Sequence, residues 1–239
     1  MVSTRSTANT VTEPEDDAWE SCSNDSQPAA APISSSARKR TIKQHLRAKQ
    51  NRILGITTTP TETGADCVHL KEVLDENPDT DFGFVIYRCT YDSQEKWDRF
   101  MGHLTEQTFL NLRGEGAEDL FWRIDWCVQE DAKGLKNASV EKVGRRFKKW
   151  VKEHGDGSDW PRYQACVKVD KHDLNSVLTG PSPEDFDIDR HGAVTLVSLS
   201  PDEGHCWVGA AYPVPRIFTL LEIGWDNFAP KEAYDVACP

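Results

Sequence analysis

The chain has 239 residues, 28% of them charged, and its formal net charge is −11. This length suffices for one domain with tails, and the acidic balance disfavours general nucleic-acid binding by the folded part, because it repels phosphate backbones. No apolar run follows a basic start, and none approaches the roughly 18 residues of a membrane span, so we expect neither secretion nor membrane insertion. The expected location is cytoplasmic, nuclear or both.

Residues 1–65 are expected to form a disordered arm. Residues 1–37 carry six acidic residues and one basic residue and are rich in Ser, Thr, Asn and Pro, a composition that cannot bury enough apolar surface to fold. The segment 38–52 has no acidic residue and fits a nuclear-import signal, a nucleic-acid arm, a contact to the protein's own acidic body, or a solvated basic run. Its basic residues are Arg38, Lys39, Arg40, Lys43, Arg47, Lys49 and Arg52.

Residues 66–225 predict a single α+β domain, and residues 226–239 a C-terminal tail. The stretch 83–91 is β-branched and aromatic, which predicts a strand, and 93–112 has the apolar spacing of a helix that Asp92 can cap. Further along the chain, the predicted strands are 120–129, 163–170, 193–199 and 206–210, and the other predicted helices are 68–74, 139–152, 171–179 and 215–222.

The order of these elements predicts one mixed or antiparallel sheet with helices on one face. If helix 139–152 is treated as an insertion, two strand–helix–strand halves remain, which is the split arrangement of ferredoxin-like folds. The alternative is an ordinary mixed sheet in three layers. Because ferredoxin-like sheets can pair face to face, this fold is compatible with a homodimer.

Strand alternation predicts an open sheet face opposite the helices. Three cations around one carboxylate on that face suit a small anionic ligand or the acidic side chain of a protein partner. A half-solvated face with weak ion pairs explains the same pattern. The four residues are Arg88, Arg123, Asp125 and Lys168.

The predicted helix 139–152 carries a second charged patch. Its cations outnumber Glu141 and Glu153, so the patch suits an acidic partner or the acidic tail segment 13–25, and an ordinary solvated helix face has the same pattern. The cations are Lys142, Arg145, Arg146, Lys148, Lys149 and Lys152.

Sequence motifs of catalytic sites are absent, and we expect no cofactor. The Gly-x-Ser-x-Gly elbow, the Walker loop, Gly-x-Gly-x-x-Gly and His-Glu-x-x-His do not occur, which favours a protein without enzymatic activity and leaves catalytic residues unassigned. The seven cysteines are scattered singly and the seven histidines lack ligand spacing, which predicts free thiols and no metal site.

A set of short motifs is spread over roughly residues 82–225. The motifs are Gly83-Phe-Val-Ile-Tyr-Arg-Cys-Thr-Tyr91 followed by Trp97 and Phe100, Arg146-Phe-Lys-Lys-Trp150, Pro161-Arg-Tyr163, the strand ending at Asp170, and Leu174 with Val177. Together they resemble a family of filamentous-fungal (ascomycete) proteins with no established activity. The resemblance implies a cytosolic or nuclear fungal protein and transfers no function.

Two functions are compatible with these features. The first is a non-enzymatic intracellular interaction or regulatory module, which the absence of catalytic motifs and the segregated charge favour. The alternative is a small-molecule binder or cofactor-independent enzyme of the dimeric α+β barrel type, with its ligand near the four charged residues of the open face. RNA binding on the sheet is disfavoured by the acidic body.

Overall fold

The computed structural model describes residues 63–80, 82–185, 187, 189–230 and 235–239. These residues belong to one compact unit, Ile42–Pro239. The expected arm lies outside the described residues as far as residue 62, and the segment 38–52 lies outside them entirely.

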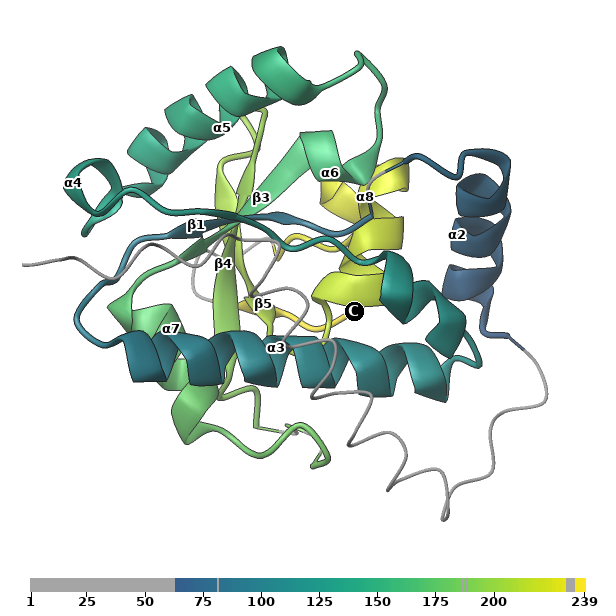
Figure 1. Ribbon diagram of the computed structural model, residues 1–239, viewed down its shortest axis with the longest axis horizontal. Helices are drawn as coiled ribbons and strands as arrows, with labels where there is room; N and C mark the ends of the chain where they lie inside the picture. The colour runs from purple at the N-terminus through teal and green to yellow at the C-terminus, as the bar shows by residue number, and fades with distance from the viewer. Residues whose placement is uncertain (1–62, 81, 186, 188, 231–234) are drawn as a thin grey trace, which may run out of the picture. The chain divides into compact units, whose positions relative to one another are not determined.

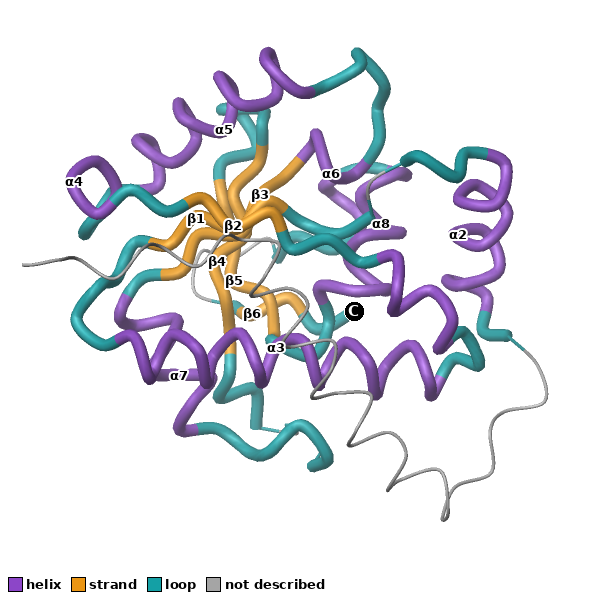
Figure 2. The backbone as a smooth tube through the Cα atoms, in the orientation of Figure 1, coloured by secondary structure: helices purple, strands orange, loops and turns teal. Residues whose placement is uncertain are grey.

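A six-stranded mixed sheet forms the centre of this unit (Figures 1 and 2), which confirms the predicted α+β class. The strand order is β2–β1–β3–β4–β5–β6. β1 is parallel to both of its neighbours, β4 is antiparallel to both of its neighbours, and β6 is parallel to β5. The ferredoxin-like layout is not confirmed. The strands are β1 (Val85–Arg88), β2 (Cys127–Gln129), β3 (Ala165–Val169), β4 (Ala193–Ser198), β5 (His205–Gly209) and β6 (Val236–Ala237).

Helices cover both faces of the sheet, as in the three-layer alternative, and not one face as the element order suggested. The chain passes through α3 (Gln94–Gly114) to reach β2 on one side of β1, and then through α5 (Val140–His154) to reach β3 on the other side. Because parallel connections are right-handed, two connections that run in opposite directions across a sheet place their helices on opposite faces. Figure 1 shows α5 on one side of the sheet and α3 with α7 (Lys171–Thr179) on the other.

The remaining helical segments are short or lie at the ends of the sheet. They are α2 (Ala65–Glu76), η1 (Glu118–Arg123), α4 (Ala132–Leu135), α6 (Pro161–Gln164), η2 (Pro213–Ile217), α8 (Phe218–Ile223) and η3 (Trp225–Asn227).

Each face of the sheet carries its own apolar core. On the α3 face, Phe84, the residue before β1, and Ile86 of β1 belong to the larger core. On the α5 face, Val85 and Tyr87 belong to the smaller core, together with Phe147 of the helix. All four residues of β1 are buried, as expected of a central parallel strand that is covered on both faces. The face predicted to be open at β1 is therefore covered.

Serine side chains cap the two long helices that flank the sheet. The hydroxyl of Ser139 accepts a hydrogen bond from the backbone N–H three residues on, at 3.4 Å, and begins α5 as its position predicts. In α3 the cap is Ser93, whose hydroxyl accepts the equivalent bond at 3.2 Å. Asp92, the residue expected to cap, instead forms ion pairs with Lys136 and Lys171.

The predicted strand 120–129 is wrong over its first half. Residues Glu118–Arg123 form the 3-10 helix η1, and only Cys127–Gln129 pair with β1. Phe121 is buried and packs edge-to-face on Phe109 of α3, with ring centroids 5.2 Å apart. The apolar residues of this stretch therefore pack against α3 as a short 3-10 helix.

Residues near the C-terminus also join the domain. β6 pairs with Trp207 and Val208 of β5, and the side chains of Trp225 and Phe228 are buried with ring centroids 5.2 Å apart. Part of the stretch that the sequence assigns to a tail thus completes one end of the sheet and core.

Candidate functional site

The structure does not bring together the four charged residues expected on one open face. In the register of β1 and β3, Arg88 lies opposite Val169 and Tyr87 lies opposite Lys168. Because neighbouring residues of a strand point to opposite faces, the side chains of Arg88 and Lys168 lie on different faces of the sheet. The four residues therefore occupy separate environments.

Arg88 anchors the end of β1 to the start of α3. Its side chain is 5% exposed and lies between the rings of Tyr91 and Trp97, with Cζ 4.8 Å from each ring centroid. The guanidinium donates hydrogen bonds to the Thr90 carbonyl and to the Glu130 carboxylate, both at 2.9 Å. These contacts account for its burial, because a buried guanidinium is tolerated when it is paired and stacked.

Arg123 caps the C-terminal end of α2. Its Nη1 donates to the carbonyl of Leu74 at 2.6 Å, and its Nη2 donates to the carbonyls of Asn77 and Pro78 at 3.3 and 3.2 Å. A cation at this position satisfies carbonyl groups that lack helical partners and interacts favourably with the negative end of the helix dipole. Arg123 therefore has a structural role, and it is not among the residues that line the cleft described next.

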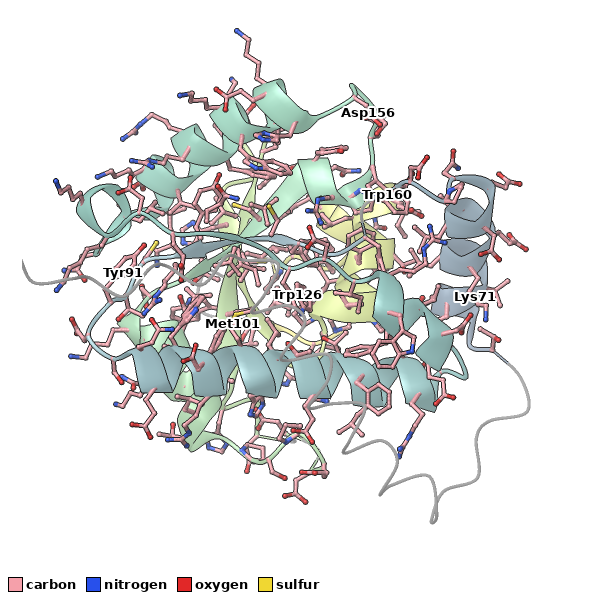
Figure 3. The ribbon with its side chains drawn as sticks, viewed as in Figure 1. Lys71, Tyr91, Met101, Trp126, Asp156 and Trp160 are labelled. Atoms are coloured by element: carbon pink, nitrogen blue, oxygen red, sulfur yellow. The ribbon has the colours of Figure 1, made fainter. Side chains whose placement is uncertain are left out.

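Asp125 lines a cleft of about 440 Å³ between strand β2, at the edge of the sheet, and the C-terminal end of α5. This volume falls within the range of roughly 300–1,000 Å³ that is typical of small-molecule sites. Figure 3 labels Asp156, in the loop after α5, and Trp160, the residue before α6. Both helices contribute residues to the lining of the cleft. The lining residues are Asp125, Cys127, Gln129, Trp150, Glu153, His154, Arg162 and Tyr163.

Arg162 forms the buried floor of the cleft, with its side chain 2% exposed. Its Nη1 donates to the carbonyls of Gly83 and Asp125 at 3.2 and 2.9 Å, and its Nη2 donates to the Asp125 carboxylate at 2.8 Å. Gly83 has a φ of 113°, and an added Cβ would lie 3.0 Å from the Asp125 carbonyl oxygen, so this close approach requires glycine. Arg162 thus ties together the segments that lead into β1, β2 and β3.

Aromatic rings along α5 form one wall of the cleft. Trp150 stacks on His154 with ring centroids 4.8 Å apart and on Phe147 with centroids 6.3 Å apart. The ring of Tyr163 lies 6.1 Å from that of Trp150. Residues three and four apart on a helix share a face, so the amphipathic pattern that buries Phe147 also brings Trp150 and His154 to the cleft.

The cations of α5 face solvent. The helix is held to the sheet by Val143 and Phe147, which are fully buried, and Figure 3 shows nitrogen-tipped side chains projecting from α5 away from the sheet. Lys142 is half-buried. The exposed cations are Arg145, Arg146, Lys148, Lys149 and Lys152.

Two of these exposed cations have carboxylate partners. Arg146 pairs with Asp131 at 2.8 Å, and Lys149 pairs with Glu153 at 3.6 Å. Within the described part of the chain, the other three exposed cations of α5 form no ion pair. We call this set, Arg145, Lys148 and Lys152, the basic stripe, because the spacing of three and four residues places it along one side of the helix.

A buried charged cluster lies where β3 runs into α7. Lys168 Nζ is 2.5 Å from Asp170 Oδ2 and 3.9 Å from Asp173 Oδ2, and Asp173 also accepts a hydrogen bond from the Thr195 hydroxyl at 2.9 Å. Ligands of open α/β sheets often bind at the carboxyl ends of strands, where the connections diverge, and this cluster has such a position. Its groups are paired with one another, so we assign it to anchoring α7.

The two carboxyl groups of this cluster have opposite pKa shifts. Burial raises the pKa of Asp173 from 3.8 to about 6. For Asp170, burial favours the neutral acid, but the hydrogen bonds from Lys168 and from backbone N–H groups of α7 outweigh it and lower the pKa below 3.8.

The contribution of Asp173 to the free energy of unfolding is expected to fall as the pH rises from 3.8 to about 6. In this interval Asp173 holds its proton more tightly in the folded than in the unfolded chain, so its stabilising contribution is complete below 3.8 and lost above about 6. Urea unfolding of the native protein and of Asp173→Asn across this interval checks the prediction. The contribution of Asp173 to the change of the free energy of unfolding with pH should be absent from the variant. The same dependence on pH in both proteins would contradict the assignment to Asp173.

The described cysteines are free thiols, as predicted. Burial raises the pKa of Cys67 and of Cys206 to about 12, which keeps both thiols protonated and unreactive near neutral pH. Within the described ranges, no three His, Cys, Asp or Glu side chains are placed to hold a metal ion. No helix described here combines the length and apolar character that crossing a membrane requires.

Sequence reasoning included Asp125 but missed its partner Arg162. The sequence predicts a strand over 163–170, whereas the structure forms α6 (Pro161–Gln164) before β3 begins. Pro161 at the first helical position was the available signal for that helix. The four-residue spacing of Trp150 and His154 was likewise readable as one face of a helix.

No protein-family model matches this chain, and no curated protein and no solved structure matches it either. The resemblance to a fungal family stays a prediction.

Proposed function

We propose that the protein is a non-enzymatic interaction module that binds an acidic segment of a partner protein through the exposed basic face of α5. The observation that carries this proposal is the basic stripe. Its three cations are exposed, aligned on one helix and without an ion pair in the described chain, although the protein as a whole has a net charge of −11. Exposed cations that form no ion pair with the described residues suit a complementary anionic surface.

The platform for this contact is preformed. α5 is fixed to the sheet by the buried side chains of Val143 and Phe147, so a partner does not need to order the helix on binding. Its 15 residues span about 22 Å, which matches a short extended segment rather than a large globular surface.

The expected interaction is weak and salt-dependent. Exposed ion pairs contribute only about 0–1 kcal/mol each, so useful affinity requires several of them acting together. Charges at the surface are screened over about 8 Å at physiological ionic strength. Electrostatic complementarity of this kind increases the association rate and the specificity more than the affinity.

An acidic protein segment fits this face better than nucleic acid. The acidic residues Asp131, Glu141 and Glu153 lie within or beside the same helix and interrupt the positive surface. A continuous phosphate backbone would also approach the rest of an acidic chain, at an electrostatic cost that a short segment avoids.

The proposal predicts that reversing the charge of two residues of the basic stripe weakens the binding of an acidic peptide. The probe is a fluorescently labelled peptide of alternating Glu and Asp, titrated with the full chain at low salt and followed by anisotropy. We expect Lys148→Glu/Lys152→Glu to weaken binding at least about tenfold, because two attractive contacts become repulsive.

A matched control is Lys96→Glu/Arg99→Glu, which makes the same charge change at exposed positions of α3. If both double variants weaken binding equally, only the net charge matters and the assignment to α5 is wrong. Failure of the native protein to bind the peptide at low salt also counts against the proposal.

The cleft favours a second candidate function, that of a small-molecule binder. The barrel-type dimer expected for such a binder requires a free sheet face, and helices cover both faces in the described chain. We therefore place a ligand site of this kind in the cleft, at Asp125 and Arg162, and not on an open sheet.

A further inference from the structure

The cleft beneath the C-terminal end of α5 is separate from the basic stripe. Glu153, Trp150 and His154 line the cleft, whereas none of the three residues of the stripe does. The geometry points to a binding site for a small organic cation, a primary ammonium or guanidinium group attached to an apolar body. This inference does not rest on the proposed docking function of α5.

The charges that line the cleft favour a cation. The lining includes two carboxylates, Asp125 and Glu153, and one permanent cation, Arg162. Arg162 and Asp125 neutralise each other through a contact of 2.8 Å. Among the described residues, the Glu153 carboxylate has one ion-pair contact, with Lys149 at 3.6 Å between two exposed groups, and such a contact is easily exchanged for a ligand. The net charge of the lining is therefore negative.

The C-terminal end of α5 also favours a cation in the cleft. The C-terminus of a helix carries a partial negative charge, and Glu153 and His154 belong to its last turn. His154 is held there, with Nδ1 2.9 Å from the carbonyl oxygen of Trp150 and its ring stacked on that of Trp150. The exposed cations of α5 point to solvent, where salt screens them, and do not enter the lining.

An anion fits the same cleft poorly. Of the lining side chains, Arg162 is the natural anchor for an anion, but it is 2% exposed and its two Nη atoms already donate three hydrogen bonds inside the protein. An anion would have to compete with the Asp125 carboxylate for these donors while lying near Glu153. A cation can approach the exposed Glu153 carboxylate and leaves the Arg162–Asp125 pair intact.

The aromatic residues of the cleft suit the body of such a ligand. Trp150 and Tyr163 both line it, and aromatic rings combine apolar surface with an attraction for cations. The volume of about 440 Å³ accommodates a ligand with one ring and a short amine chain.

Three probes with the same ring and different charge test this inference. Benzylamine, benzyl alcohol and benzoate are titrated into the ¹⁵N-labelled full chain, and NMR shifts are followed at the indole N–H of Trp150 and the amides of Gln129, Glu153 and Tyr163. We expect saturable shifts at these positions with benzylamine and binding of benzyl alcohol at least about tenfold weaker, because it lacks the charge-assisted contact. Benzoate should leave the NMR signals of these residues unshifted.

Glu153→Gln provides the decisive variant, because the side chain is exposed and its removal leaves the Arg162–Asp125 pair intact. It should weaken benzylamine binding about tenfold, through loss of one charged partner. Glu141→Gln, at the opposite end of α5, makes the same charge change outside the cleft and should have no effect. The inference is overturned if benzoate binds in the cleft as well as benzylamine, if Glu153→Gln leaves benzylamine binding unchanged, or if no probe shifts the cleft signals.

Discussion

Replacement of Phe218 by alanine is expected to lower the free energy of unfolding by about 3–5 kcal/mol. Phe218 is fully buried at the start of α8 and packs edge-to-face on Phe82, Phe84 and Trp160, with ring centroids 5.0, 5.3 and 5.3 Å away. The substitution removes these aromatic contacts and leaves a cavity where α8 meets the segment before β1 and the residue before α6. Urea denaturation of the full chain measures the loss.

Two control variants separate this packing from a general sensitivity of α8. Phe218→Leu keeps most of the volume and should cost less than Phe218→Ala. Ile223→Ala removes a side chain that is 67% exposed at the end of the same helix and should change stability by no more than about 0.5 kcal/mol. A Phe218→Ala protein as stable as the native one would contradict the aromatic core described above.

Replacement of Arg162 by alanine is expected to lower the free energy of unfolding by about 3 kcal/mol, at the lower end of the range for breaking a buried ion pair. The lower end applies because the Asp125 side chain is 24% exposed and water can partly replace the lost partner. The carbonyls of Gly83 and Asp125 lose their side-chain donor at the same time. Urea denaturation again gives the magnitude.

Arg145→Ala is the matched control, since it removes an exposed arginine from the neighbouring helix and should cost no more than about 0.5 kcal/mol. Arg162→Lys keeps the charge but loses the two-pronged geometry, so it should fall between alanine and the native residue. If Arg162→Ala lowers the free energy of unfolding no more than Arg145→Ala does, Arg162 does not hold together the segments that lead into β1, β2 and β3.

Local signals in the sequence predicted the long helices well. The helix expected at 139–152 is α5 (Val140–His154), with Ser139 as its cap and Gly155 directly after its end, and the helix expected at 171–179 is α7 with the same bounds. Caps and apolar spacing act within a few residues, so a single segment contains the information.

Features that depend on distant segments were not predictable in the same way. Coverage of both sheet faces follows from the order β2–β1–β3, which no local pattern encodes. The alternation of Trp122 and Ile124 resembles a strand, yet the chain forms η1 there because Leu120 and Phe121 pack in the core on the α3 side. Tertiary packing therefore decided the structure of this stretch.

The candidate site was predicted only in part, for the same reason. The cations of α5 were recognised because helical spacing places them on one side, and the structure exposes five of the six. Asp125 was selected for its charge, but its partner Arg162 lies 37 residues away in sequence and meets it only in the folded chain. Arg88 and Lys168 were grouped together because the sequence does not reveal that their register places them on opposite faces.

The most direct test of the central claim is to map where an acidic peptide contacts the full chain. The measurement is an NMR titration of the ¹⁵N-labelled protein with the Glu/Asp peptide at low salt. The account predicts shifts concentrated at Arg145, Lys148 and Lys152 of α5, which disappear at high salt as the charges are screened. Shifts centred on another surface, or absent from α5 while the peptide binds, would contradict the claim that this helix is the docking surface.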